Sequence, residues 1–437
     1  MLTLKQDTML GNVPPDWGVK PLKALLQSNA PGDWGDDGGP HMFRVLRSTN
    51  LTNERRLDLS DIAVRALKPE KAELLAPRKG DLLLERSGGG PDQPVGRIGH
   101  VGEDLPGHAF SNFLHLLRPD ASAISPAYLS WVLFRINRTG RILRLEQQTT
   151  QMRNLNFRDY LTMPLPVPPS GEQAAIASVL DSADDAINQA RTAVEQASTL
   201  RRALMQVAFN CEMTSEPRKN TDAGKIAQSW EALKGKQAFS VVTGGNSSVY
   251  ALKPLRGSEV ADAWFMKVGD FNLTENARCI TRTKIGFVAG NNPSFKLLPI
   301  GTIIIAKRGE AIMKNRVRTT TVPVALDPNL MALKVRDDIS PEFFRYQLEW
   351  RKLARYVESS GVPQLNNKDL YPRWFVRAPD DQQKEIVAVL SAAEHREDAL
   401  RDKLSALETL KKSLMHDLLT GTVRVDPALF NKEERMI

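Results

Sequence analysis

The chain has 437 residues, 41% of them hydrophobic, so it is too long for one typical domain and can bury two to four cores. Its net charge of +8 comes from 59 basic and 51 acidic residues, which permits a polyanionic partner without requiring one. No run of 18 apolar residues and no secretory pattern occur, so we expect a soluble, cytoplasmic protein without a membrane partner. Cys211 and Cys279 are too few for a disulfide scaffold or a zinc cluster, and we expect no bound metal.

In chain order, the same landmarks occur twice. Trp17 and Trp230 begin the two copies, and each is followed by an Asn-Leu-Thr triplet that we interpret as a shared turn. Gly80 and Gly301 then precede the apolar runs 82–84 and 303–305. Short β-type runs between Gly, Pro and Asn predict a mixed α and β globular region at about 17–150 and again at about 230–360.

A strict register follows each globular region. Leu155-Asn156 and Asp159 recur 210 residues later as Leu365-Asn366 and Asp369. The same separation, without a gap, relates further pairs: Glu172-Gln173 and Gln382-Gln383, Ile176 and Ile386, Leu180 and Leu390, Leu204-Met205 and Leu414-Met415. The chain therefore contains an internal repeat, in which each copy consists of a globular region followed by a helical region.

Both helical regions carry a heptad pattern of apolar residues. The first stripe includes Leu200 and Leu204, and the second is interrupted at Glu397 and Asp417 before Gly421 ends the helix. Such a stripe must be covered, and the second helix of the same chain is the economical partner. About 38 paired residues form a rod of roughly 57 Å, which matches on the order of 17 base pairs of B-DNA. A dimerisation coiled coil is the alternative, disfavoured because the globular regions repeat as well.

We therefore predict an α+β fold: two mixed α/β target-recognition domains separated by two long helices that pair as an antiparallel coiled coil, with a pseudo-two-fold internal repeat. The expected boundaries are 1–160 for target-recognition domain 1, 161–210 for the first helical spacer, 211–229 for a polar linker, 230–370 for target-recognition domain 2, 371–425 for the second helical spacer and 426–437 for a C-terminal tail.

These residues resemble the specificity subunits of type I restriction-modification systems. The most specific matches are Pro164-Leu165-Pro166-Val167-Pro168-Pro169 before Glu172-Gln173, and Leu418-Leu419-Thr420-Gly421. The resemblance implies that each target-recognition domain binds one half of a bipartite site in double-stranded DNA. It also implies two methyltransferase subunits, which modify adenine with S-adenosylmethionine, and restriction/translocase subunits, which use ATP and Mg. Gln382 replaces the usual Glu, which leaves the contact at the start of the second helix open.

The sequence offers no convincing catalytic motif of its own. Asn292-Pro293-Ser294-Phe295 approaches the Asn-Pro-Pro-aromatic motif of adenine methyltransferases, but Ser occupies its third position and we interpret it as a loop. A phosphate-binding Gly-Lys-Ser/Thr loop and a Pro-Asp, Glu-x-Lys nuclease motif are both absent. We expect a non-catalytic protein that binds no cofactor itself.

Residues for DNA contact are expected after the apolar runs, where Arg and Lys could reach phosphates or base edges. The candidates are Arg86, Ser87, Gly88 and Arg97 in the first copy, and Lys307, Arg308, Gly309, Lys314, Arg316 and Arg318 in the second. A solvated loop is an equally good interpretation of any one of them. Arg135, Arg138, Arg141 and Arg144 recur every three residues on an expected helix, where we favour simple solvation. The alternative for the whole chain is a coiled-coil adaptor without sequence-specific DNA binding.

Overall fold

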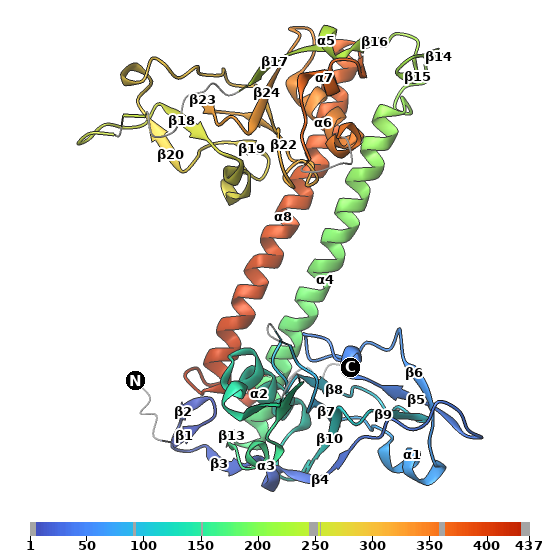
Figure 1. Cartoon of the computed structure of the whole chain (residues 1–437). Coiled ribbons are helices and arrows are strands. Elements are labelled where there is room, and N and C mark those ends of the chain that lie inside the picture. The colour runs from blue at the N-terminus through green and yellow to red at the C-terminus, as the bar shows by residue number, and fades with distance from the viewer. Residues whose placement is uncertain are drawn as a thin grey trace. The chain divides into compact units, whose positions relative to one another are not determined.

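The computed structural model describes residues 6–90, 93–149, 152–243, 252–253, 255–357 and 363–429. Its mixed helices and strands confirm the α+β class. The chain divides into two compact units: unit 1 is 1–191 with 402–437, and unit 2 is 192–401. The long helices α4 (Ser170–Phe209) and α8 (Asp380–Leu419) each contribute residues to both units (Figure 1). The predicted helical spacers are therefore shared between the units in this division.

Unit 1 contains a four-stranded antiparallel sheet, a three-stranded sheet and short two-stranded ladders. The four-stranded sheet has the order β4 (Leu26–Pro31), β10 (Leu114–Pro119), β7 (Leu82–Glu85), β8 (Ile98–His100), and the three-stranded sheet the order β6 (Ala63–Ala66), β5 (Met42–Leu46), β9 (His108–Phe110). The ladders are β1 (Gln6–Thr8) with β2 (Gly11–Val13), β3 (Gly18–Pro21) with β13 (Pro164–Val167), and β11 (Glu146–Thr149) with β12 (Met152–Leu155). The shorter helices are α1 (Pro69–Leu75), α2 (Pro126–Arg138) and α3 (Phe157–Leu161).

Unit 2 follows a similar plan, with one more strand in its larger sheet and, among the described residues, two ladders instead of three. Its larger sheet has the order β17 (Phe239–Thr243), β24 (Leu330–Val335), β21 (Ile303–Ala306), β22 (Val317–Thr320), β19 (Cys279–Ile280), and its smaller sheet the order β20 (Ile285–Phe287), β18 (Ala263–Met266), β23 (Val324–Leu326). The ladders are β14 (Arg218–Thr221) with β15 (Gly224–Ala227) and β16 (Glu231–Lys234) with β25 (Trp374–Arg377). The shorter helices are α5 (Gly235–Ala238), α6 (Pro341–Arg351) and α7 (Asn367–Leu370).

The two smaller sheets show that the repeat extends to topology. In unit 1, β5 pairs antiparallel with β6 and parallel with β9. In unit 2, β18 pairs antiparallel with β20 and parallel with β23. Parallel pairs are the minority in sheets overall, so a middle strand with one antiparallel and one parallel partner in both smaller sheets supports the internal repeat inferred from sequence.

The segment 211–229 is more ordered than the predicted polar linker. It carries the β14–β15 hairpin, in which the Thr221 hydroxyl donates to the Gly224 carbonyl at 2.8 Å. The β1–β2 hairpin of unit 1 has the matching bond from Thr8 to Gly11 at 2.7 Å. Cys211, with φ +58, stands at the end of α4 where Gly421, with φ +67, stands at the end of α8. This segment is therefore part of the repeat.

A buried tryptophan anchors the start of each long helix. The Trp17 indole donates to Glu172 at 3.1 Å in unit 1, and the Trp230 indole donates to Gln382 at 2.7 Å in unit 2. Gln382 therefore makes the contact that the sequence left open. Its amide also donates to Glu216 at 2.7 Å, whereas Glu172 accepts from Arg424.

Within each unit α4 and α8 lie side by side and exchange ion pairs (Figure 1). In unit 1, Arg191 contacts Glu408 at 2.9 Å and Lys411 pairs with Asp184, so the two helices run in opposite directions there. In unit 2, Arg201 contacts Glu397 at 2.9 Å. The heptad prediction needs one correction, because Leu200 is 46% exposed and the neighbouring Arg201 faces the partner helix instead.

Candidate DNA-binding surface

The predicted basic segments occupy equivalent places in the two units. In unit 1, Leu155 donates its backbone N–H to the Arg86 carbonyl at 2.8 Å, and Gly88 donates to the Arg153 carbonyl at 3.2 Å. In unit 2, the corresponding bonds run from Leu365 to Lys307 at 2.9 Å and from Gly309 to Pro363 at 2.8 Å.

An isolated bridge joins the middle residues of both segments, Ser87 with Asn154 and Arg308 with Gln364. Gly88 and Gly309 both have positive φ, +121° and +80°, a conformation that favours glycine. Each segment is thus held by an isolated bridge beside the residues that precede the long helix of its own copy, 153–155 before α4 in unit 1 and 363–365 before α8 in unit 2. The equivalence of the two segments is confirmed, while their contact with DNA stays a prediction.

Four of the predicted cations are available to an anionic ligand. Arg308 is exposed and Lys307 half-buried, and neither side chain has a hydrogen bond or ion pair with another described residue. Arg86 is exposed and its guanidinium lies over the Phe157 ring, 5.4 Å from the centroid. Lys314 makes a 3.8 Å ion pair with Glu310, in which both side chains are more than half exposed, so solvent weakens it.

The other three predicted cations hold the fold together. Arg97 binds Glu85 through two hydrogen bonds of 2.8 Å and also donates to two backbone carbonyls, those of Leu51 and Ser48. Arg316 donates to the Phe271 carbonyl at 2.8 Å. Arg97 and Arg316 therefore brace the two turns that contain the repeated Asn-Leu-Thr triplets.

Arg318 is also committed to the fold. It donates to the Asn276 and Val317 carbonyls, and burial lowers the pKa of its guanidinium. These bonds favour a structural role for Arg97, Arg316 and Arg318 over direct base contact.

The expected arginine helix ends early. Helix α2 stops at Arg138, Gly140 adopts φ +70°, and a separate 3-10 turn carries Arg141 and Arg144. Arg135 is 7% exposed and donates to the Met415 carbonyl, so it packs against α8 within unit 1. The evenly spaced set is therefore not one cationic face.

Sequence reasoning missed a basic hollow in each unit, because helices and loops far apart in the sequence build it. The hollow in unit 2 has a volume of about 500 Å³, contains Glu349, and is lined by six cations: Arg201, Arg202, Lys314, Arg316, Arg318 and Lys352. The hollow in unit 1, of about 450 Å³, is lined by Lys411 and Lys412 at the positions that repeat Arg201 and Arg202. The sequence signal that could have indicated these hollows is the 210-residue register, which pairs Arg201 and Arg202 with Lys411 and Lys412.

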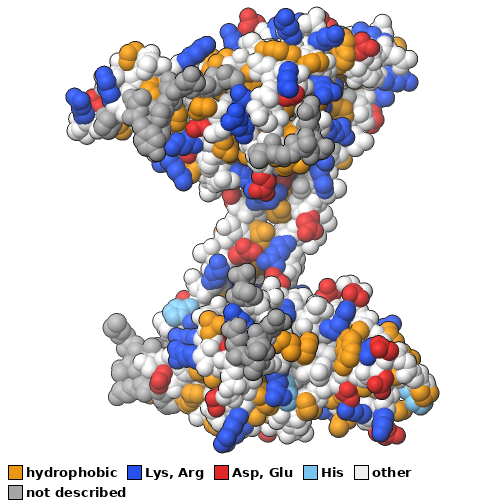
Figure 2. Space-filling view, viewed as in Figure 1, with side chains coloured by type: hydrophobic (Ala, Val, Ile, Leu, Met, Phe, Trp, Pro, Cys, Tyr) orange, Lys and Arg blue, Asp and Glu red, His pale blue; other side chains and the backbone are white. Residues whose placement is uncertain are grey.

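On the visible face of each unit, Lys and Arg side chains are interspersed with Asp and Glu (Figure 2). No group of three or more His, Cys, Asp or Glu among the described residues could hold a metal ion. Across that same part of the chain, helices long and apolar enough to cross a membrane are lacking.

Asn292 is 4% exposed and bonds to backbone groups of Lys253 and Val288, as expected for a loop.

The comparisons with known proteins point in one direction. No protein-family model matches the chain. The chain is similar to a putative type I restriction enzyme MjaX specificity subunit of Methanocaldococcus jannaschii, with 22% identity over 426 residues covering 96% of each protein. The MjaIX specificity subunit of the same organism is 24% identical over 242 residues, covering 49% of this chain and 48% of that protein.

Two solved structures share the fold. The S subunit of a type I restriction-modification system from M. genitalium has a TM-score of 0.58 and 15% identity, covering 95% of this chain and 98% of that one. A chain from a study of complex assembly and conformational transition of the type I R-M system has a TM-score of 0.52 and 14% identity, covering 94% and 99%. These matches confirm the resemblance to type I specificity subunits. The relatives are named as specificity subunits, in agreement with the prediction that the chain is not itself an enzyme.

Proposed function

We propose that this chain is the DNA-specificity subunit of a cytoplasmic type I restriction-modification complex. In this proposal each unit reads one half of a bipartite site in double-stranded DNA, and partner subunits methylate adenine or cleave the DNA. The observation that carries the proposal is the repeated basic segment, held by the same backbone bonds in both units. The chain binds no cofactor in this scheme, and S-adenosylmethionine, ATP and Mg belong to its partners.

Methylation mapping tests this function in cells with and without the gene for the chain. The expected result is methylated adenine in a two-part motif with a fixed spacer, present only with the chain. Purified complex should bind that motif on the order of 10³-fold or more tightly than random DNA. The rival, a coiled-coil adaptor, predicts an unchanged methylome and equal affinity for both DNAs.

The proposal also places one methyltransferase subunit on each unit. Leu410 in unit 1 and Leu200 in unit 2 occupy equivalent positions on the long helices and are 51% and 46% exposed. The cations Lys412 and Arg202 lie two residues further along, and neither takes part in an ion pair with a described residue. Residues i and i+2 of an α-helix point to different sides, so the placement rests on the exposed leucine, which recurs once per unit and suits an apolar side chain of the partner.

The stoichiometry of the purified complex tests this placement. Leu410→Asp should reduce two methyltransferase subunits per chain to one, and adding Leu200→Asp should remove both. Leu74→Asp is the matched control, because Leu74 is 70% exposed on α1 of unit 1. Two methyltransferase subunits retained by the folded double variant would disprove the placement.

A further inference from the structure

Unit 2 contains a buried arginine at the contact between α6 and α8. The Arg345 side chain is 3% exposed and donates two hydrogen bonds to Glu394 of α8, at 2.8 and 3.2 Å. It also contacts Glu342 and Glu349 of its own helix, at 2.6 and 2.8 Å. Its guanidinium lies 4.0 Å from the centroid of the Tyr346 ring, and the Tyr346 hydroxyl donates to the same Glu394 carboxylate at 2.8 Å.

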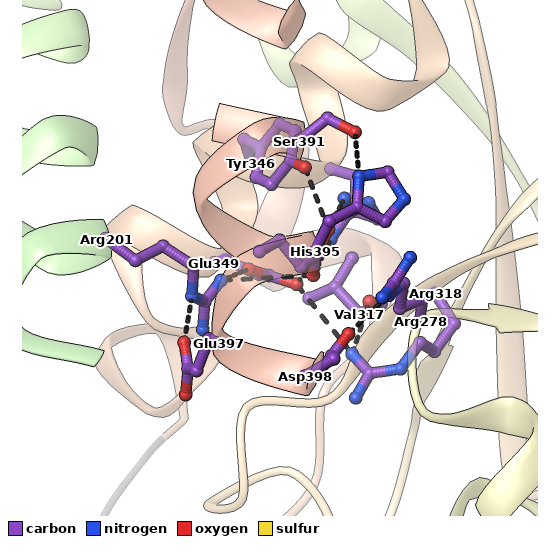
Figure 3. A network of polar contacts seen from close by, with 12 residues as sticks. Arg201, Arg278, Val317, Arg318, Tyr346, Glu349, Ser391, His395, Glu397 and Asp398 are labelled. Atoms are coloured by element: carbon purple, nitrogen blue, oxygen red, sulfur yellow. Dashed lines mark hydrogen bonds and ion pairs between the residues drawn. The ribbon is translucent and has the colours of Figure 1, made fainter. Parts of the chain in front are cut away.

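Further ion pairs extend this contact to α4. Arg201 lies between Glu349 and Glu397, with distances of 3.0 and 2.9 Å (Figure 3). Arg278, which precedes β19, pairs with Asp398 of α8. The globular part of unit 2 is thereby tied to both long helices through directional bonds.

Unit 1 reaches the same arrangement from a different element. Arg55, in the loop after the Asn-Leu-Thr turn, donates to Ser130 at 2.6 Å and to Asp181 of α4 at 2.5 Å. Its guanidinium lies 3.9 Å from the centroid of the Trp131 ring, and the Trp131 indole donates to the same Asp181 carboxylate at 3.0 Å.

The two arrangements match position by position in the shorter helix. When Ser125-Pro126 is aligned with Ser340-Pro341, Trp131 corresponds to Tyr346 and Ser130 corresponds to Arg345 itself. Unit 1 therefore has serine where unit 2 has the arginine, and a loop supplies the missing guanidinium. We call each set a clamp: Arg55, Trp131 and Asp181 in unit 1, and Arg345, Tyr346 and Glu394 in unit 2.

The backbone of unit 1 is distorted at the residue that supplies this guanidinium. Arg55 has φ +69, in the left-handed region that non-glycine residues rarely adopt, although its side chain is only 7% exposed. Such a conformation persists where the surroundings require it. In both units an arginine lies over an aromatic ring and shares one carboxylate of a long helix with that ring's polar group. The arginine comes from a strained loop in unit 1 and from a helix in unit 2, which indicates that both units require this geometry.

Stability alone does not account for the clamps. A buried ion pair often contributes no more than a well-packed apolar pair of the same volume, because desolvation offsets the attraction. What a planar, bidentate arginine adds is a fixed orientation of the two groups it joins.

We propose that the two clamps are positioning devices that hold each recognition module in one orientation on the long helices, and so make the complex strict about spacer length. This inference rests on the proposed function. The clamp residues would not touch DNA. They would act through the modules that do, because a module free to tilt on its helix could accept half-sites at neighbouring spacings.

The experiment measures binding of the intact complex to DNAs that carry both half-sites with spacers one to three base pairs shorter or longer than the preferred length. Arg345→Lys keeps the buried charge but loses the bidentate contact with Glu394, and Arg55→Lys keeps the charge but loses the planar group that bonds both Ser130 and Asp181. The pair Arg345→Met with Glu394→Gln removes both charges at similar volume. The matched control is Arg336→Met with Glu231→Gln, an ion pair of 2.9 Å in unit 2 outside the clamp.

Wild type and control should lose at least about tenfold in affinity per base pair of spacer change. The clamp variants should lose about threefold or less, with the half-site sequences unchanged. Folded variants with a spacer preference as strict as wild type would overturn the clamp proposal, and so would a stability loss with no change in that preference. Failure of the wild-type complex to distinguish the motif from random DNA would instead refute the proposed function.

Discussion

The salt dependence of DNA binding can show which cations of the candidate surface contact phosphates, as we expect of the free ones, and which only stabilise the fold. Lys307, Arg308 and Lys314 are the free or weakly paired cations of unit 2, so we consider their simultaneous replacement by alanine. Removing one cation from a phosphate lowers the slope of log affinity against log salt by about 0.9, so removing three lowers it by about 2.7. Raising salt from about 50 to about 200 mM should then cost wild type about 40-fold more affinity than the variant.

Fluorescence anisotropy with labelled cognate DNA over this salt range measures both slopes. Lys384→Ala controls for the loss of a single surface charge, because Lys384 is exposed on α8 outside the candidate segment. For Arg97→Ala we expect the opposite of the triple variant, a loss of stability with no direct effect on the salt slope. The substitution leaves Glu85 buried without its partner, which should cost roughly 3 kcal/mol of folding free energy. An unchanged slope in the folded triple variant would show that the segment 307–314 does not contact phosphates.

Two further predictions concern spacer length and pH. Inserting four residues at Ser198, with a matching insertion near Glu408, adds about 6 Å of helix. The spacer in the methylation motif should lengthen by about two base pairs, and a folded, active variant with an unchanged motif would contradict this. Burial lowers the pKa of His100 and His115 to about 4, so unfolded unit 1 binds more protons than the folded unit between pH 6.5 and 4. Unit 1 should therefore lose stability as the pH falls below 6.5, by up to about 3 kcal/mol for each histidine at pH 4 before solvent screening reduces the effect. His100→Gln with His115→Gln should flatten this loss in denaturant titrations followed by hydrogen exchange.

Much of the architecture could be predicted because the chain repeats itself. The 210-residue register predicted two long helices, and α4 and α8 have that same separation at both ends. The looser order of landmarks upstream, with Gly80 and Gly301 before the apolar runs, placed Arg86 and Lys307 at equivalent positions, which the backbone bonds to Leu155 and Leu365 confirm. Local signals served as well, since Gly421 ends α8 with the left-handed conformation that its residue type favours.

Side-chain roles could not be predicted in the same way, because charge in a sequence does not reveal its partner. Arg97 and Arg308 both follow apolar runs, yet Arg97 is bonded to Glu85 and to carbonyls from the turn around residue 50, whereas Arg308 is exposed. The heptad pattern likewise placed Leu200 in the seam, but Arg201 takes the inward position because Glu349 and Glu397 bind it there.

The sequence by itself determined the repeat, the helical spacers and the class of fold, since these follow from periodicity and from residue types at fixed separations. Only the tertiary structure decided which cations are free and which are structural, and it alone revealed that Arg55 and Arg345 reach equivalent clamps from different elements. The physical reason is that an ion pair depends on where folding brings two side chains together, and Arg55 and Asp181 are 126 residues apart in the chain.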